Sequence, residues 1–409
     1  MLRRHGRRYL VPIILLILTC TAIVLIGAGR RYNQLDQAIQ VLAQVKLRFV
    51  ERVSAVDLFR SYLRTGTIDG MLSALHDPYT RYLTPPEYRE LRSQTQGTMG
   101  GVGITLNTQG KSLVIMKALK GSPGEAAGLR RGDRIIKVNG RQTSKMTVEE
   151  AVAAIRGPAG TYVRLTISRG AGNAAHLFEV RIKRANIRLP SVEWEMVEDS
   201  EAGRIEIITL SQFAERTAAE LEDALRDAER NAVRGLILDL RYNPGGLLDS
   251  AVYVAGKFLD GGVVLYMVRR DGDRKPFYAP KNRLRRYPLV VLVNEWSASA
   301  SEIVAGALKD RHAATLVGTR TFGKGVVQEI VPISGGAALS VTIAKYLTAG
   351  GRSINKVGVE PDVVVDLPGA MARALKEGRL EDLQRLERLQ RERAIAILRA
   401  RLVRAKTAS

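Results

Sequence analysis

Three segments of this 409-residue chain carry side chains that could do chemistry, and the first is rich in serine. Asn294–Glu302 (NEWSASASE) follows an apolar strand and opens a helix. The first amides of a helix have no partner within it, so a serine placed there lies beside N–H groups that can bind a developing oxyanion. The segment predicts either a nucleophilic serine or, if Ser297, Ser299 and Ser301 only cap the helix, an ordinary helix start.

The second segment, Thr321–Gln328 (TFGKGVVQ), places Lys324 between two glycines. Glycines let the chain approach other backbone closely. Burial lowers the pKa of an amine because it disfavours the charged form. A neutral lysine can take a proton from a serine hydroxyl near pH 7, whereas a Gly-Lys-Gly triplet alone is more typical of a surface turn.

The third segment, Asp239–Gly246 (DLRYNPGG), lies between a buried strand and a helix. Its glycines, Gly245 and Gly246, could present backbone amides where an acyl oxygen collects negative charge. The alternative is an ordinary turn between a strand and a helix. A Ser-His pair is not favoured, because His312 lies at the far end of the same predicted helix as Ser299, ~20 Å away along its axis.

The three motifs NxxSASASE, FGKGxxQ and DLRxNPGG together resemble the carboxyl-terminal processing peptidases, which are serine proteases that use a Ser/Lys pair. The resemblance covers roughly residues 60–366. It implies that Ser299, 25 residues before Lys324, is the nucleophile. Lys324 would be the general base, and Gln328 would orient it. On a straight strand Lys324 and Gln328 would lie ~13 Å apart, so the role of Gln328 requires the chain to bend.

The same resemblance implies an oxyanion hole and a peptide-binding domain. The hole would consist of the backbone N–H groups of Ala300 and of Gly246 or Gly245. The β-rich block 95–185 resembles the PDZ domain of the family, with GGVGI as its carboxylate-binding loop and residues 121–140 as its middle signature. The implied peptide-binding residues are Gly101, Val102, Gly103, Ile104 and Arg156, although a lone arginine is more often solvated surface.

Strands and helices must alternate to position these segments. The pattern predicts an α/β fold, and the resemblance specifies a crotonase/Clp-like α/β protease core at residues 190–366. A PDZ domain precedes this core, with an N-terminal helical region at 32–94 and a charged C-terminal helix at 367–409. Apolar residues spaced three or four apart predict helix throughout 33–64, either as a stalk or as a packing hairpin.

Composition excludes several functions. The single cysteine, Cys20, rules out intrachain disulfides and CxxC sites, and four scattered histidines argue against a histidine-rich metal centre. The net charge of +22 is concentrated at the ends, since residues 1–31 hold six arginines and no acid. A dispersed central surplus does not favour nucleic-acid binding. We expect no metal and no cofactor.

The N-terminus predicts a membrane location. Residues 11–28 form an uncharged stretch of 18 residues, long enough for a transmembrane anchor. The arginine-rich residues 1–10 would be a cytosolic tail by the positive-inside rule. This pattern predicts a single-pass protein of the bacterial inner membrane with its catalytic part in the periplasm. A cleaved signal peptide is the competing interpretation.

The expected function is therefore that of a membrane-anchored periplasmic serine endopeptidase. It would bind the C-terminal tails of protein substrates through the PDZ domain and cleave near the carboxyl end. The alternatives are a catalytically silent PDZ-protease scaffold and an enzyme that an adaptor or activator protein switches on. Helices at both ends of the chain are also compatible with a homodimer.

Overall fold

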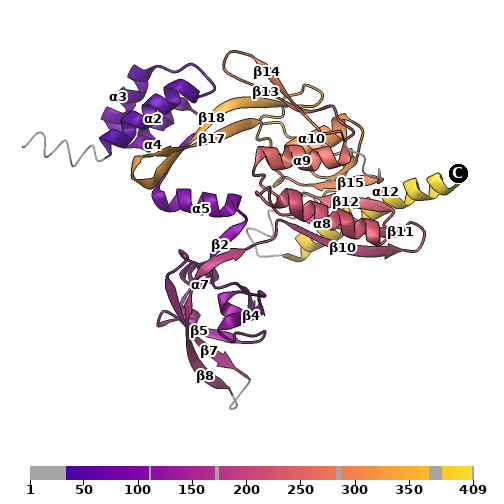
Figure 1. Cartoon of the computed structure of the whole chain (residues 1–409), viewed down its shortest axis with the longest axis horizontal. Helices are drawn as coiled ribbons and strands as arrows, with labels where there is room; N and C mark the ends of the chain where they lie inside the picture. Colours follow the sequence, from indigo (N-terminus) through magenta and orange to yellow (C-terminus); the bar gives the residue numbers. More distant parts are fainter. Residues whose placement is uncertain (1–33, 110–111, 171–174, 282–286, 368–379, 408–409) are drawn as a thin grey trace, which may run out of the picture. The chain divides into compact units, whose positions relative to one another are not determined.

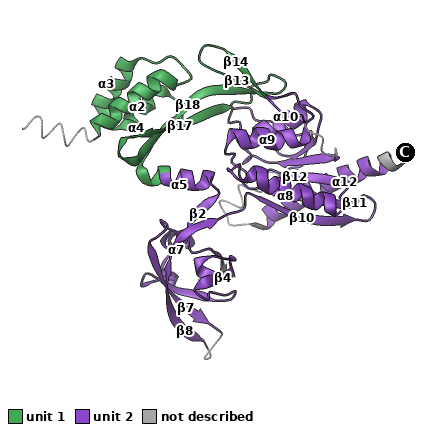
Figure 2. Cartoon of the chain, in the orientation of Figure 1, with its two compact units in different colours: residues 1–88, 265–277, 325–355 green, residues 89–264, 278–324, 356–409 purple. Residues whose placement is uncertain are grey.

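A computed structural model of the chain describes residues 34–109, 112–170, 175–281, 287–367 and 380–407 (Figure 1). The chain forms two compact units, coloured separately in Figure 2. The first unit comprises residues 1–88, 265–277 and 325–355, and the second comprises residues 89–264, 278–324 and 356–409. Ser299 and Lys324 both belong to the second unit.

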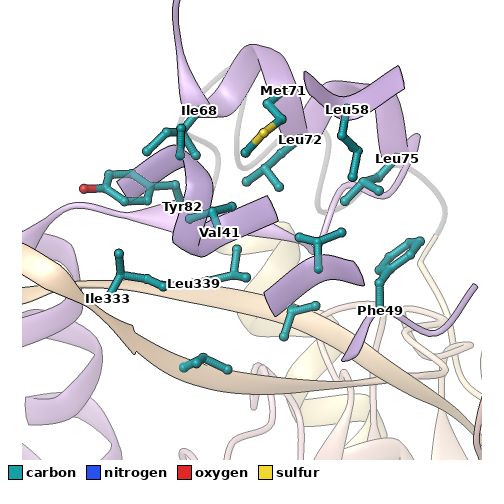
Figure 3. Packing of buried hydrophobic residues seen from close by; sticks show 14 of the residues in the cluster. Val41, Phe49, Leu58, Ile68, Met71, Leu72, Leu75, Tyr82, Ile333 and Leu339 are labelled. Carbon is teal, nitrogen blue, oxygen red and sulfur yellow. The ribbon is translucent and has the colours of Figure 1, made fainter. Parts of the chain in front are cut away.

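The first unit packs short helices on an antiparallel sheet. The helices are α2 (Leu35–Arg48), α3 (Ala55–Thr65) and α4 (Ile68–Leu72). The main strands are β1 (Arg81–Leu83), β18 (Ala337–Thr348), β13 (Val263–Val268), β14 (Arg274–Tyr278) and β17 (Val326–Ile333), which pairs with β18. Figure 3 shows Val41, Met71 and Leu339 in the apolar cluster between helices and sheet.

The helix predicted throughout 33–64 is in fact two helices, with a break at residues 49–54. At the break, Val50 N donates a hydrogen bond to Thr342 O of β18 at 2.8 Å. The side chain of Phe49 is buried in the same cluster. A contact with a strand almost 300 residues further along the chain therefore ends α2, which the local apolar spacing could not reveal.

The second unit contains a small β-rich module. Its sheet is formed by β3 (Ile104–Gln109), β4 (Ser112–Ala118), β5 (Arg134–Val138), β7 (Tyr162–Arg169) and β8 (His176–Lys183), with the short β6 (Arg141–Gln142) beside β5. Helix α7 (Val148–Ile155) starts at a capping box between Thr147 and Glu150. A separate ribbon pairs β2 (Thr98–Gly101) with β9 (Ala185–Arg188).

The other sheet of the second unit has the order β10-β11-β12-β15-β16-β19. Its strands are β10 (Val192–Asp199), β11 (Gly203–Leu210), β12 (Gly235–Asp239), β15 (Leu289–Val293), β16 (Thr315–Gly318) and β19 (Val363–Val364). Only β10 is antiparallel to its neighbour. The associated helices are α8 (Thr217–Arg230), α9 (Leu248–Phe258), α10 (Ala300–Asp310) and α12 (Leu380–Thr407). The mixed α/β class predicted from the sequence is confirmed.

The C-terminal helix α12 covers one face of this sheet. Ala394, Leu398 and Leu402 are buried against side chains of β11, β12 and β15. At the other end of its buried face, Gln390 is also buried and donates to Val365 O at 3.0 Å. The charged helix expected from the sequence is therefore part of the core of the second unit.

The predicted location in the inner membrane, with the catalytic part in the periplasm, is contradicted. Among the residues that the structure describes, no helix combines the length and the apolar character needed to cross a bilayer. The longest, α12, has 28 residues but is rich in arginine and glutamate, so its length does not make it a span. The predicted anchor at residues 11–28 and the basic tail before it lie outside the described residues.

Glu206, on β11, is a buried carboxyl group. Its side chain is only 1% exposed, and neither of its oxygens has a hydrogen-bond partner within the described parts of the chain. Burial, to which the like charge of Asp227 on α8 adds, raises the pKa of Glu206 to about 7. The folded protein therefore keeps this proton at pH values where an unfolded chain loses it.

We expect Glu206→Gln to remove a pH-dependent loss of stability. The unfolded chain ionises this glutamate near pH ~4.3, so the free energy of unfolding falls as pH rises from there to about 7. The difference in free energy of unfolding between the variant and the parent should therefore increase with pH in favour of the variant. Between pH 4 and pH 8 this increase should be on the order of 3 kcal/mol. Urea unfolding at both pH values measures this. The exposed Glu193→Gln is the control, and a pH-independent difference for Glu206→Gln would contradict the prediction.

Candidate active site

The three segments singled out from the sequence follow three neighbouring parallel strands. Asp239–Gly246 begins at the end of β12, Asn294–Ser299 follows β15, and Thr321–Lys324 follows β16. The strands β12, β15 and β16 are adjacent and parallel, so their carboxyl ends meet at one edge of the sheet. Active sites of open α/β sheets form at this edge.

Ser299 stands at the start of α10 in an unusual backbone conformation. Its φ of 54° and ψ of −112° lie in a region that residues with side chains rarely occupy. Such strain persists only where surrounding contacts enforce it, and it is concentrated at functional sites. The neighbouring hydroxyl groups have structural partners, since Ser297 Oγ donates to Leu240 O and Ser301 Oγ donates to Asn243 O.

The carboxylate of Glu302 connects the serine loop to the lysine loop. Its Oε2 accepts hydrogen bonds from Ser299 N and Lys324 N, both at 2.9 Å. Its Oε1 accepts from Thr321 Oγ1 at 2.6 Å and from Gly323 N at 2.7 Å. The side chain is fully buried, and this burial raises the pKa of Glu302, while the four hydrogen bonds to the charged form oppose the rise.

This shared carboxylate limits the separation of Ser299 and Lys324. Because both backbone nitrogens contact one oxygen, they lie no more than about 6 Å apart. The four-carbon stem of a lysine can span that separation. Both residues are half-buried, so their side chains remain accessible to a substrate. The structure thus holds the predicted nucleophile and base next to each other.

The glycine turn after β12 packs directly on the serine loop. Asn243 O accepts from Ala298 N at 3.1 Å, and Asn243 Oδ1 accepts from Gly245 N at 2.9 Å. A Cβ on Gly245, whose φ is 105°, would lie 2.8 Å from the Cβ of Ser299. Only glycine allows so close an approach in this conformation.

The predicted oxyanion donors differ in their hydrogen bonds. The N–H of Gly245 is already bound to Asn243 Oδ1, which leaves it unsuited to hold a substrate oxygen. Within the described residues, neither Gly246 N–H nor Ala300 N–H donates a hydrogen bond. Ala300 is also the first residue of α10, where backbone N–H groups have no partner in the helix.

An ion pair at the end of β12 fixes the same turn to α12. Arg241 Nη2 and Asp239 Oδ2 lie 2.6 Å apart, and both side chains are about nine-tenths buried. Arg241 Nη1 donates to Glu387 O at 3.1 Å and to Gln390 Oε1 at 3.2 Å. Burial by itself would lower the pKa of Arg241, but the hydrogen bonds to Asp239 and the charge of that carboxylate hold it above its ordinary value. The C-terminal helix therefore supports the glycine turn.

Gln328 belongs to the first unit, on β17. The strand begins only at Val326, and its register shifts between Val327 and Gln328. The straight strand that would separate Lys324 from Gln328 is therefore absent. The Nε2 of Gln328 is buried and has no hydrogen-bond partner within the described residues. Its role beside Lys324 stays a prediction.

The residues predicted to bind a peptide line a groove of about 400 Å³ in the β-rich module. The lining includes the loop Gly101–Gly103, then Ile104 at the start of β3, and Val152, Ile155 and Arg156 from α7. Within the described residues, the N–H groups of Val102 and Gly103 donate no hydrogen bond. The groove is apolar apart from these amides, Thr105 and the exposed Arg156.

Sequence reasoning missed the residues that hold the loops together. Glu302 and Asn243 belong to the motifs, yet no role followed from their positions alone. One signal was available for Glu302: it lies in an otherwise apolar stretch of helix, where an acidic residue needs buried partners. For Asn243 no comparable signal exists, because asparagine is common in any turn.

Comparisons with known proteins point to one family of peptidases. Residues 204–365 match "Peptidase family S41", and residues 90–168 match "PDZ domain". A CtpA-like serine protease of Staphylococcus aureus (strain bovine RF122 / ET3-1) is 34% identical over 377 residues, covering 90% of this chain and 74% of the relative. A carboxyl-terminal-processing protease of Synechocystis is 41% identical over 304 residues, covering 74% of this chain and 70% of that protein.

A solved structure supports the same assignment. The photosystem II D1 C-terminal processing protease superposes with a TM-score of 0.53 at 32% sequence identity. The match covers 81% of this chain and 92% of the solved one. The chain therefore belongs to peptidase family S41, as a serine peptidase of the carboxyl-terminal-processing type that carries a PDZ domain.

Proposed function

We propose that the protein cleaves polypeptides near their carboxyl ends by a Ser299/Lys324 mechanism. The observation that carries the proposal is the single oxygen of Glu302 that binds the backbone of both residues. Lys324 takes the hydroxyl proton as Ser299 attacks the peptide carbonyl, and then gives it to the leaving amine. Water next attacks the acyl-enzyme, which releases the new carboxyl terminus and restores the serine.

The oxyanion of the tetrahedral intermediate would lie between two backbone amides. Those of Gly246 and Ala300 support this role, because neither donates to another group in the described residues. Preorganised donors of this kind stabilise charge where it develops, and the loss of one typically lowers kcat by about 10²–10³-fold. Gly245 would shape the turn, since its own N–H is bound to Asn243. In this proposal the side chain of Gln328 orients Lys324.

The groove of the PDZ domain would hold the substrate by its C-terminus. The amides of Val102 and Gly103 would bind the terminal carboxylate, and β3 from Ile104 would pair with the peptide backbone. The apolar lining favours an apolar terminal residue. Arg156, at the C-terminal end of α7, supports the proposal because it adds a positive charge to the same groove.

We expect Arg156→Gln to weaken the binding of substrates with a free carboxyl terminus. Hydrogen bonds to charged groups are worth about 1.5–3 kcal/mol, so KM should rise about tenfold or more. A substrate amidated at its C-terminus should show no such change. Initial rates on both forms of one peptide measure the effect. The exposed Arg141→Gln on β6 is the control, and an equal effect on both peptides would contradict a carboxylate contact.

One experiment distinguishes the proposal from its alternatives. The full chain is incubated with a fluorophosphonate probe and, separately, with unfolded casein. Labelling of Ser299 together with cleavage supports the proposal, and labelling with cleavage only after a cell extract is added supports activation by an adaptor. The absence of both would contradict the proposal and favour a silent scaffold. Sedimentation of the same sample tests the predicted homodimer.

A further inference from the structure

Three exposed aromatic side chains lie on the three loops that carry the catalytic groups. Tyr242 precedes the glycine turn, Trp296 stands three residues before Ser299, and Phe322 stands two residues before Lys324. Their exposed fractions are 40%, 44% and 55%. Large apolar side chains that are exposed together mark a binding surface, because folding alone would bury them.

Backbone hydrogen bonds place the three residues close to each other. Asn294 Oδ1 accepts from Tyr242 N at 3.0 Å and from Trp296 N at 3.1 Å, so these two nitrogens are at most about 6 Å apart. Phe322 N donates to Ser297 O, next to Trp296, at 3.1 Å. The backbones of the three aromatic residues are therefore anchored near each other, at the edge of the sheet where Ser299 lies.

Tyr242 is held by further contacts. Its φ of 60° is rare for a residue with a side chain, and its hydroxyl donates to Glu387 Oε1 of α12 at 2.8 Å. A ring fixed at both its backbone and its hydroxyl loses little conformational freedom when another molecule packs on it. Tyr242 thus offers a preorganised apolar face next to the glycine turn.

We propose that Tyr242, Trp296 and Phe322, the aromatic surface, bind apolar side chains of the substrate beside the bond that is cut. This inference rests on the proposed function and adds a substrate class to it. A polypeptide whose carbonyl reaches Ser299 must pass over the loops that carry these rings. Aromatic rings provide a large contact area with few rotatable bonds, so they suit many apolar side chains in an unfolded segment. Segments with leucine, valine, methionine or phenylalanine around the cut are therefore the preferred substrates.

Kinetics test this role. Trp296→Ala and Phe322→Ala should each raise KM for unfolded casein by about tenfold, as truncation of a central aromatic contact does. The rate at which a small fluorophosphonate labels Ser299 should stay within about twofold of the parent, because the probe does not use the surface. The matched control is Trp194→Ala, which removes a tryptophan of similar exposure, 40%, from β10. Equal KM values for Trp296→Ala, Phe322→Ala and this control would overturn the inference.

Tryptophan fluorescence provides a second readout without catalysis. The chain has two tryptophans, so Trp194→Phe leaves Trp296 as the sole reporter. In a Ser299→Ala background, an amidated peptide of alternating leucine and serine should change the emission of Trp296 with saturation. An amidated peptide of serine alone should leave the emission of Trp296 unchanged. In the Trp296→Phe variant, where Trp194 is the sole tryptophan, neither peptide should change the emission. The amide excludes capture through the terminal carboxylate.

The outcomes separate this inference from the proposed function. If the parent neither labels at Ser299 nor cleaves casein, the proposed function fails, while Trp296 emission still reports whether the surface binds peptides. If the parent cleaves and Trp296 responds equally to both peptides, the apolar preference is wrong. Slower labelling in Trp296→Ala or Phe322→Ala would also contradict the inference, because it would show that the rings only support the catalytic loops.

Discussion

Lys324→Arg is expected to abolish peptide hydrolysis while the protein stays folded. Arginine keeps the positive charge, but its pKa is too high for it to accept a proton from Ser299. The backbone N–H that binds Glu302 is unchanged, so the loop should keep its place. Loss of a general base costs about 10²–10⁴-fold, and we expect kcat/KM to fall by at least about 10³-fold. Ser299→Ala should lower activity to background.

Three measurements check this prediction. Cleavage of unfolded casein gives the loss of activity, and thermal unfolding shows that each variant remains folded. Lys281→Arg, at an exposed lysine of the second unit, should retain the activity of the parent. The rate of the parent should also rise from pH 6 towards mildly alkaline values as the base loses its proton. A flat pH profile, or substantial activity in Lys324→Arg, would exclude lysine as the base.

Glu302→Gln is expected to cause the second large loss of activity. The cause would be displacement of Ser299 and Lys324, since Glu302 takes no direct part in the reaction. The carboxylate accepts four hydrogen bonds, two on each oxygen. In glutamine, one oxygen becomes an NH₂ group, which would face two N–H or O–H donors and leave them unpaired in a buried site. Each lost hydrogen bond to a charged group costs about 1.5–3 kcal/mol. We expect kcat to fall by about 10²-fold or more and the free energy of unfolding by about 3–5 kcal/mol.

A matched control variant distinguishes the loss of the Ser299 and Lys324 anchor from a general loss of stability. Glu295→Gln changes another glutamate of the same loop, whose carboxylate accepts a hydrogen bond from Thr319 Oγ1 at 2.9 Å. This control should alter stability and kcat only slightly. In Glu302→Gln, fluorophosphonate labelling should slow in proportion to kcat, because Ser299 and Lys324 lose their common anchor. Normal labelling with reduced stability would mean that Glu302 only supports the fold.

Much of the fold could be predicted because buried parallel strands are continuous apolar runs. An apolar strand was expected directly before Asn294, and β15 (Leu289–Val293) ends there. The break after α2 could not be predicted, because it depends on the distant hydrogen bond between Val50 and Thr342. Local periodicity carries no information about such a contact.

In the candidate site, too, some features could be predicted from the sequence and others could not. The resemblance of the three motifs to the family predicted Ser299 and Lys324, whose side chains would do the chemistry. They did not reveal that Glu302 binds the backbone of both, or that Gly245 has its N–H occupied while Gly246 does not. These facts depend on the angles at which three loops leave the sheet, and only the assembled structure supplies them. The role of Gln328 remains a prediction for the same reason.

The contact between Arg241 and α12 has a consequence for the folding of the chain during its synthesis. A ribosome adds residues in order, at about 5–20 per second. Ser299 and Lys324 therefore emerge before Glu387 and Gln390, which hold Arg241 and the glycine turn. A nascent chain therefore holds the loops of Ser299 and Lys324 before it has the residues that fix the glycine turn. A chain that lacks α12 would therefore also lack these contacts, and its glycine turn would lose that support.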